Sequence, residues 1–173
     1  MNDDKAKLLS GYQRMMIRVK DMWTHAAHDD LHQYIDAATE KAVELEELSR
    51  EEAERIGDYL RRDLNDAAEF IANTEQSLGD WMRFDLELIE ARLLDAFSIM
   101  VDQTHASLDN LAEQARLAVE WQSGEITGPG TLYCENCGQE FNFHRPSYIL
   151  PCANCGGILF KRYTPDEEKT IEP

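Results

Sequence analysis

Two matched cysteine motifs near the C-terminus constrain this chain more than any other feature. The stretch CENCG begins at Cys134 and CANCG begins at Cys152, and these motifs hold all four cysteines of the chain. Four thiolates in two C-x2-C pairs, with fourteen residues between the pairs, form the tetrahedral set of soft ligands that zinc prefers. Each pair is followed by a glycine, which can take the positive φ that closes such a turn. The spacing therefore predicts a zinc ribbon.

The predicted ligands of one structural zinc ion are Cys134, Cys137, Cys152 and Cys155. A catalytic zinc usually keeps three protein ligands and one position for water, whereas four thiolates here fill the coordination sphere. A closed structural site is therefore favoured, and no catalytic residues are predicted. Iron in a rubredoxin-like electron carrier uses the same ligands and stays open as an alternative. His144 lies between the motifs, and a surface position is favoured for it over a place among the ligands.

The residues around the motifs alternate as strands do, on both sides of each cysteine pair. We therefore expect a small β module over residues 131–164. A module of this size depends on its metal for folding. The sequence predicts that Cys134→Ser unfolds the ribbon while the helices survive.

Most of the preceding chain carries a helical pattern. Apolar residues recur at steps of three and four in three successive segments. These stripes are Leu8, Tyr12, Met15, Val19, Met22 and Ala26, then Leu31, Ile35, Ala38, Ala42 and Leu45, then Ile56, Leu60, Leu64, Ala67 and Ile71. Ser49 and Glu52 form a capping-box pattern at the start of the third helix. From Trp81 to about Gln122 the pattern predicts one long helix, whose narrow stripe must be buried against partner helices.

The expected fold is mainly α: an elongated helical bundle or coiled-coil hairpin with a small C-terminal β zinc ribbon. Residues 1–122 form the acidic helical region and residues 131–164 form the ribbon. Residues 123–130 are expected to be a linker, because three glycines and a proline fall within these eight residues. Residues 165–173 have the composition of an acidic disordered tail.

The charge restricts the partners. The chain carries 17 basic against 34 acidic residues. Such a surface repels phosphate backbones and anionic lipids. Nucleic acid and membranes are therefore disfavoured as partners, and a basic protein partner or plain solubility fits better. No stretch reaches the eighteen or so apolar residues that cross a bilayer, and the N-terminus lacks the apolar core of a secretory signal. We expect a cytoplasmic protein.

Three histidines, His25, His28 and His32, would share one face of a continuous helix. Asp29 or Asp30 could interrupt that helix, and no fourth ligand is evident nearby. A solvated histidine face is favoured, and a second metal site stays open.

The chain resembles an uncharacterised group of bacterial zinc-ribbon-containing proteins with a helical N-terminal region. The resemblance rests on ELSREEAERIGDYLRRDL (Glu47 to Leu64), on GEITGPGTLYCENCG (Gly124 to Gly138) and on CANCG, and it covers most of the chain from about Leu31 onward. It implies zinc bound by the four cysteines. It implies no established activity, substrate or partner, and it implies nothing about the three histidines.

The expected function is that of a non-enzymatic adaptor with an unidentified protein partner. No G-x-S-x-G, Walker loop or dinucleotide fingerprint occurs. In this hypothesis the helical region provides reach or self-association, a homo-oligomer included, and the ribbon docks on a protein assembly. Two alternatives stay open: a regulator that contacts nucleic acid or the transcription or translation machinery through the ribbon, and a zinc or redox sensor. The regulator requires Arg145, Lys161 and Arg162 to share one face.

Overall fold

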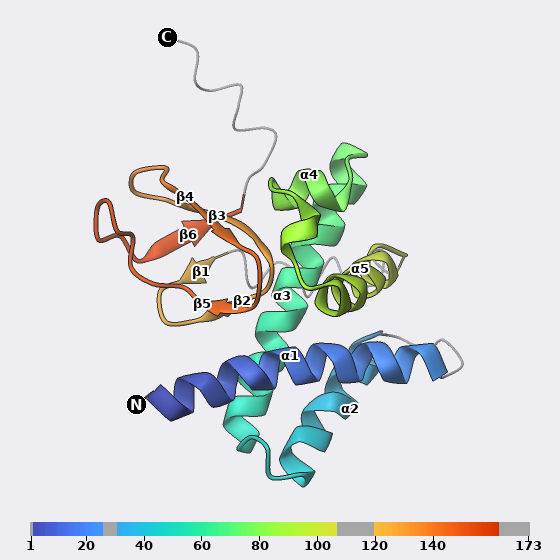
Figure 1. Ribbon diagram of the computed structural model, residues 1–173. Helices are drawn as coiled ribbons and strands as arrows, with labels where there is room; N and C mark the ends of the chain where they lie inside the picture. Colours follow the sequence, from blue (N-terminus) through green and yellow to red (C-terminus); the bar gives the residue numbers. More distant parts are fainter. Residues whose placement is uncertain (1, 26–30, 107–119, 163–173) are drawn as a thin grey trace.

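The computed structural model describes residues 2–25, 31–106 and 120–162, and it confirms a mainly helical chain with a small C-terminal β region (Figure 1). The helices of the described residues are α1 (Asn2–His25), α2 (Leu31–Glu44), α3 (Arg50–Thr74), α4 (Leu78–Met82), the short 3-10 helix η1 (Leu86–Leu88) and α5 (Ala91–Ala106). The strands are β1 (Trp121–Gln122), β2 (Ile126–Thr127), β3 (Gly130–Cys134), β4 (Glu140–Phe143), β5 (Ser147–Tyr148) and β6 (Leu159–Lys161). The expected tail over residues 165–173 lies outside the described residues.

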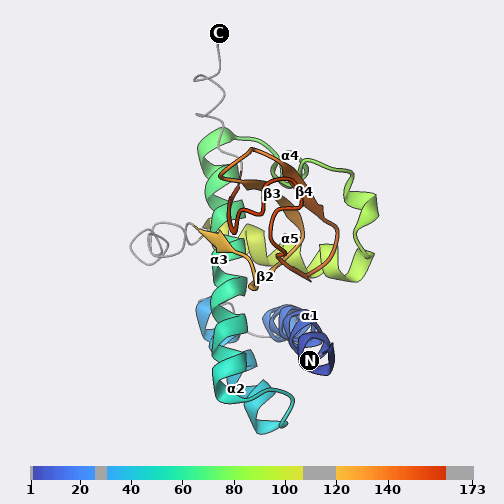
Figure 2. The ribbon, with the colours of Figure 1, turned by 90° about the vertical axis from the view of Figure 1, so that its left-hand side faces the viewer.

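The helical core forms around α3, which packs against α1, α2 and α5. In Figures 1 and 2, α1 runs across α3 rather than alongside it. The predicted stripes supply much of this core, and their fully buried members include Tyr12, Met15, Ala38, Leu60 and Ala67, while Ala26 lies outside the described residues. Leu45 is an exception, with 51% of its surface exposed, because α2 ends one residue earlier and the chain turns there.

The predicted capping box at the start of α3 is confirmed. The Ser49 hydroxyl accepts a hydrogen bond from the Glu52 main-chain N–H at 3.2 Å, and the Glu52 carboxylate accepts one from the Ser49 N–H at 2.8 Å. The Lys7 ammonium lies 2.9 Å from the same carboxylate. Two exposed N–H groups of the first turn are thereby satisfied, and α1 is attached to the start of α3.

The prediction of a single long helix from Trp81 to about Gln122 is wrong. The chain leaves the helical path at Arg83, which adopts a left-handed conformation with φ of 61°. This turn leaves Trp81 buried against the ribbon, and Asp85 then begins η1 by accepting a hydrogen bond from the Glu87 N–H at 3.0 Å. Residues 121–122 form strand β1 instead of a helix end. Residues 107–119 of the predicted long helix lie outside the described residues.

Residues 123–130, expected as a linker, contain strand β2, and residues 126–130 are buried. The glycines here permit close packing. A Cβ on Gly128 would lie 2.7 Å from the Tyr12 hydroxyl, and a Cβ on Gly130 would collide with Arg162 and stand 3.0 Å from the Trp81 ring. The glycine-rich sequence therefore marks close packing against the helices, as glycine does wherever a backbone approaches another segment.

The strands of the described residues form two antiparallel sheets. The larger has the order β1-β6-β3-β4, and the smaller pairs β2 with β5. Strand β3 is central, with Leu132 opposite Phe141 on β4 and Cys134 opposite Phe160 on β6. Leu132 and Phe160 are buried together with Trp121 and Ile149, which gives the ribbon a core of its own.

The carboxylate of Asp63, on α3, joins the helices to the ribbon. Its side chain is fully buried. It accepts hydrogen bonds from the Tyr12 hydroxyl at 2.7 Å, the Gly128 main-chain N–H at 2.7 Å and the Trp121 indole N–H at 3.0 Å. The Arg162 guanidinium lies 3.7 Å away. We call these five residues the Asp63 cluster, and they tie α1 and α3 to segments at both ends of the ribbon.

Aromatic stacking extends the same junction. The guanidinium carbons of Arg62 and Arg162 lie 5.0 and 5.1 Å from the Trp121 ring centre, and that of Arg162 lies 4.5 Å from the Trp81 ring centre. All three tryptophans, Trp23 included, are buried. Delocalised guanidinium groups suit such stacked, water-poor positions.

Asp66 gives this junction a pH dependence. Burial raises the pKa of the Asp66 carboxyl to about 6, although Arg162 and the Trp81 indole N–H, which donates to it at 2.7 Å, favour the ionised form. A carboxyl whose pKa is higher in the folded chain than in the unfolded chain contributes less stability as the pH rises from 3.8 through about 6.

We therefore expect Asp66→Asn, which cannot ionise but still accepts from Trp81, to gain stability relative to the native chain as the pH rises. The expected gain between pH 5 and 8 is about 1–2 kcal/mol in the free energy of unfolding, measured by urea denaturation at several pH values. Asp58→Asn is the matched control, because its side chain is 77% exposed on the same helix. A gain that does not change with pH would contradict the raised pKa.

Among the residues that the structure describes, no helix is both long enough and apolar enough to cross a membrane.

Candidate metal centre

The two knuckles bring four sulfur atoms to one point. Cys134 ends β3, Cys137 follows in the next turn, and Cys152 and Cys155 lie in the turn before β6. All four sulfurs lie within 4.8 Å of one another. The sulfurs of Cys134 and Cys155 are 3.5 Å apart, and those of Cys137 and Cys152 are 3.6 Å apart. Sulfurs bound tetrahedrally to zinc at about 2.3 Å stand roughly 3.8 Å apart, so this donor set fits one structural zinc ion.

The glycines after each cysteine pair close two matching turns. The Gly138 N–H donates to the Cys134 carbonyl and the Gly156 N–H donates to the Cys152 carbonyl, both at 2.8 Å. Gly138 has φ of 72° and Gly156 has φ of 73°. This left-handed conformation is the one that the sequence predicts for them, and it strains any residue with a Cβ.

The four thiols differ in exposure. Cys134 and Cys152 are buried, whereas Cys137 and Cys155 are exposed. Burial raises the pKa of the Cys134 thiol, while hydrogen bonds lower the pKa of Cys137 and Cys155. One side of the metal centre therefore lies against the ribbon core and the other side faces solvent.

Two asparagines that the sequence analysis missed complete the centre. The Asn136 side chain lowers the pKa of the Cys155 thiol, and the Asn154 side chain lowers the pKa of the Cys137 thiol, so each knuckle favours the ionised form of the exposed cysteine of the other. The sequence does contain a pattern that points to these asparagines, because both cysteine motifs have the form C-x-N-C. Donors to ligating sulfurs orient the ligands and reduce the net charge that the bound metal centre must carry.

We expect Asn136→Ala and Asn154→Ala each to weaken zinc binding by about 10- to 100-fold, because each substitution removes an amide that favours the ionised form of a ligating sulfur. The measurement is competition against a chromophoric zinc chelator. Glu135→Ala is the control, since Glu135 is exposed in the same knuckle. Affinities equal to that of the native chain would show that the asparagines do not support the ligands.

The histidines lie apart from this centre. His144 is exposed and packs edge-on against the Phe84 ring at 4.6 Å, in agreement with the surface position favoured from the sequence. His25 ends α1 and His32 follows the start of α2, while His28 lies outside the described residues. Within residues 2–25, 31–106 and 120–162, the only group of at least three ligands close enough to share a metal ion is the cysteine set.

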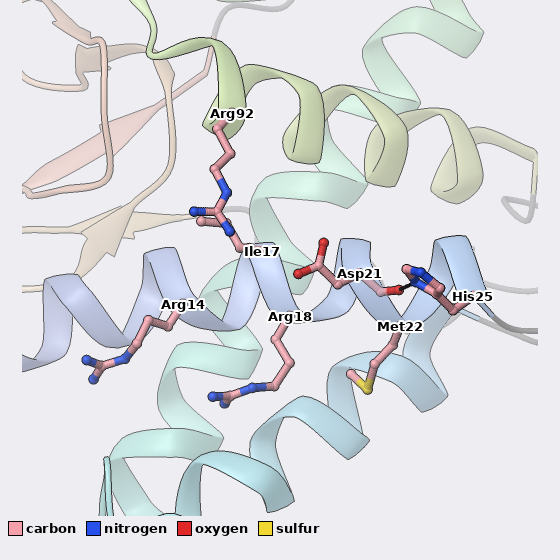
Figure 3. Close-up of a pocket in the computed structure, with 7 residues that line it drawn as sticks. All are labelled: Arg14, Ile17, Arg18, Asp21, Met22, His25 and Arg92. Carbon is pink, nitrogen blue, oxygen red and sulfur yellow. Dashed lines mark hydrogen bonds between the residues drawn. The ribbon is translucent and has the colours of Figure 1, made fainter.

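A basic pocket of about 540 Å³ lies along α1 (Figure 3). Arg14 and Arg18 line it, but both already pair with Glu47, at 3.8 and 3.0 Å. Figure 3 shows Arg92 reaching down from α5 toward Ile17, whereas Arg14 and Arg18 extend to the other side of α1. The cations do not converge, so we assign no ligand site to this pocket.

Comparison with known proteins agrees with the metal centre. Residues 20–164 match the protein family described as a zinc-ribbon containing domain. Similar relatives are the proteins named "Uncharacterized protein YbeL" of Escherichia coli strain K12 and of Escherichia coli O157:H7. Each is 28% identical over 138 residues, covering 77% of this chain and 82% of the relative. No solved structure matches the chain.

Proposed function

This chain belongs to the zinc-ribbon containing domain family, and on that premise we propose that it is a non-enzymatic adaptor whose ribbon docks on a partner protein. The helical region supplies reach or self-association, and the zinc ion is structural. A reducing cytoplasm would keep the four thiols available for zinc.

The outward side of the ribbon is the observation that carries this proposal. Residues 135–140 and 153–156 are exposed in the two knuckles. Leu150 and Ile158 bracket the second knuckle with 67% and 55% of their surfaces exposed. One exposed apolar side chain on each side of the knuckle offers a surface that a protein partner would cover.

The position of Arg162 disfavours the nucleic-acid regulator. That reading requires Arg145, Lys161 and Arg162 on one face, but only 3% of Arg162 is exposed because it lies in the Asp63 cluster. Phe160 is buried and Phe141 packs against the ribbon core, so these aromatic rings are unavailable for stacking on bases. The remaining basic surface of the ribbon is small against a chain charge of -17.

The zinc or redox sensor keeps one observation in its favour, because Cys137 and Cys155 are exposed to solvent. A sensor must release its metal on a useful timescale. Zinc that is transferred rapidly to a competing chelator or on mild oxidation would support the sensor, and very slow transfer would exclude it.

Affinity capture from native lysate tests the adaptor proposal. The variant is Leu150→Lys with Ile158→Lys, which leaves the cysteines and the ribbon core untouched, and Leu45→Lys is the control at an exposed leucine on the helical side. We expect partners that resist nuclease, persist with the control and disappear with the double variant. Partners lost on nuclease treatment would favour the regulator, and no ribbon-dependent protein at all would refute the adaptor.

A further inference from the structure

Strand β4 forms one edge of the larger sheet. The strand order is β1-β6-β3-β4, and within the described residues no strand pairs with the outer side of β4. Glu140 and Asn142 are exposed on this strand. Open edges are templates for pairing with another chain, and proteins usually shorten, charge or cover them.

The hydrogen-bond alternation identifies which main-chain groups this edge offers. The Cys134 N–H donates to the Gln139 carbonyl at 2.9 Å, and the register places Tyr133 opposite Glu140 and Thr131 opposite Asn142. In an antiparallel ladder, paired residues alternate between exchanging hydrogen bonds and pointing them away. The N–H and C=O groups of Glu140 and Asn142 therefore point away from β3. The Gln139 side chain donates to the Glu140 carbonyl at 3.2 Å, so Asn142 is the more open of the two.

A cleft begins where β4 ends. It encloses about 750 Å³ between the ribbon and the segment from η1 to the start of α5. Leu88 on η1, with 56% of its surface exposed, and Phe143 at the end of β4 give it an apolar part. Glu90 lies on the helical wall and Arg145 on the ribbon wall. The edge and the cleft are continuous along the chain, because Asn142 and Phe143 belong to both.

We propose that the edge of β4 and this cleft bind an extended segment of a partner protein. The segment adds a strand to β4 through Asn142 and places a large apolar side chain against Leu88 and Phe143. This mode combines main-chain pairing for affinity with a side-chain pocket for specificity. The proposal rests on the proposed function, because it also makes the ribbon a protein-docking module, and it assigns the ribbon a second docking surface besides the knuckle side at Leu150 and Ile158.

The charges along this edge predict which residues the bound segment carries at each of its ends. The edge is acidic at Glu140 and basic at Arg145, and all strand pairs of this sheet are antiparallel. A segment that runs antiparallel to β4 therefore carries an acidic residue toward its N-terminus, near Arg145. It carries a basic residue toward its C-terminus, near Glu140. The apolar anchor lies between them.

Selection from a displayed library of random peptides of about twelve residues, on the zinc-loaded full-length chain, tests this inference. We expect the enriched peptides to share a large apolar residue with acidic residues before it and basic residues after it. Their affinity for Leu88→Lys should fall by about tenfold or more, and their affinity for Leu45→Lys should match that for the native chain. Hydrogen exchange of the Asn142 amide should slow when a peptide is bound.

Failure of this inference is distinguishable from failure of the adaptor proposal. Peptides that bind Leu88→Lys as tightly as the native chain, or a selection without enrichment, would overturn the β4 site. If such peptides instead lose binding to the variant with Leu150→Lys and Ile158→Lys, the ribbon still docks proteins, but by its knuckle side. An Asn142 amide that exchanges at the same rate with and without peptide would overturn the strand pairing.

Discussion

Asp63→Ala is expected to lower the free energy of unfolding of the whole chain by about 3–5 kcal/mol. The substitution removes the one acceptor shared by the Tyr12 hydroxyl, the Gly128 N–H and the Trp121 indole N–H. It also leaves the Arg162 guanidinium buried without the carboxylate that lies 3.7 Å from it. Donors and charges buried without partners cost far more than the net value of the bonds that they lose.

The Asp63→Asn variant distinguishes the effect of losing the negative charge from the effect of the cavity that alanine leaves. Asparagine fills the same volume, but its amide places an N–H₂ donor among donors, so we expect a loss nearly as large as with alanine. Asp58→Ala is the matched control, because Asp58 lies on the same helix with its side chain 77% exposed and pairs only at the surface with Arg61. The measurement is urea unfolding followed by circular dichroism. An Asp63→Asn variant as stable as the native chain would show that the ionised carboxylate is not required.

The metal centre was predictable because its determinants are local in the sequence. The C-x2-C spacing and the following glycines specify the knuckle whatever surrounds it, and the structure places Gly138 and Gly156 in the required left-handed turn. The capping box at Ser49 was predictable for the same reason, since both of its hydrogen bonds lie within one turn.

The Asp63 cluster was not predictable from local pattern. Asp63 follows Arg61 and Arg62 in a highly charged helix, where its composition indicates a solvated face. The donors of three hydrogen bonds to its carboxylate lie 51 to 65 residues away along the chain. Only the assembled fold shows that one face of α3 is buried beneath the ribbon.

The junction also explains why the glycine-rich stretch and the final helix were misjudged. Helical periodicity continues past Trp81, but the indole is buried against Arg162, and the chain turns at Arg83. Glycine and proline ordinarily indicate a linker. At Gly128 and Gly130 the absence of a Cβ instead allows the ribbon to reach the helices. Tertiary contacts overrode the local preference at each of these positions.

Removal of zinc is expected to unfold the ribbon and to destabilise the helices with it. The sequence alone predicts that Cys134→Ser leaves the helices intact, because their stripes are independent of the ribbon. The structure gives a different expectation, since Trp121, Gly128 and Arg162 all reach Asp63 from the ribbon side. Once the metal is gone, a module this small cannot hold these residues in place, and Asp63 loses most of its donors.

The test compares thermal unfolding of the zinc-loaded chain with that of the chelated chain and of Cys134→Ser, followed by helical circular dichroism. We expect the zinc-loaded chain to unfold in a single transition, because the Asp63 cluster links the two regions. Both metal-free forms should melt at least about 10 °C lower, as expected when several kcal/mol are lost from a chain of this size. Combining Asp63→Asn with zinc removal should cost less than the sum of the two separate losses, because both act on the same contacts. Helical signal that melts at the same temperature with and without zinc would mean that the helices fold independently of the ribbon.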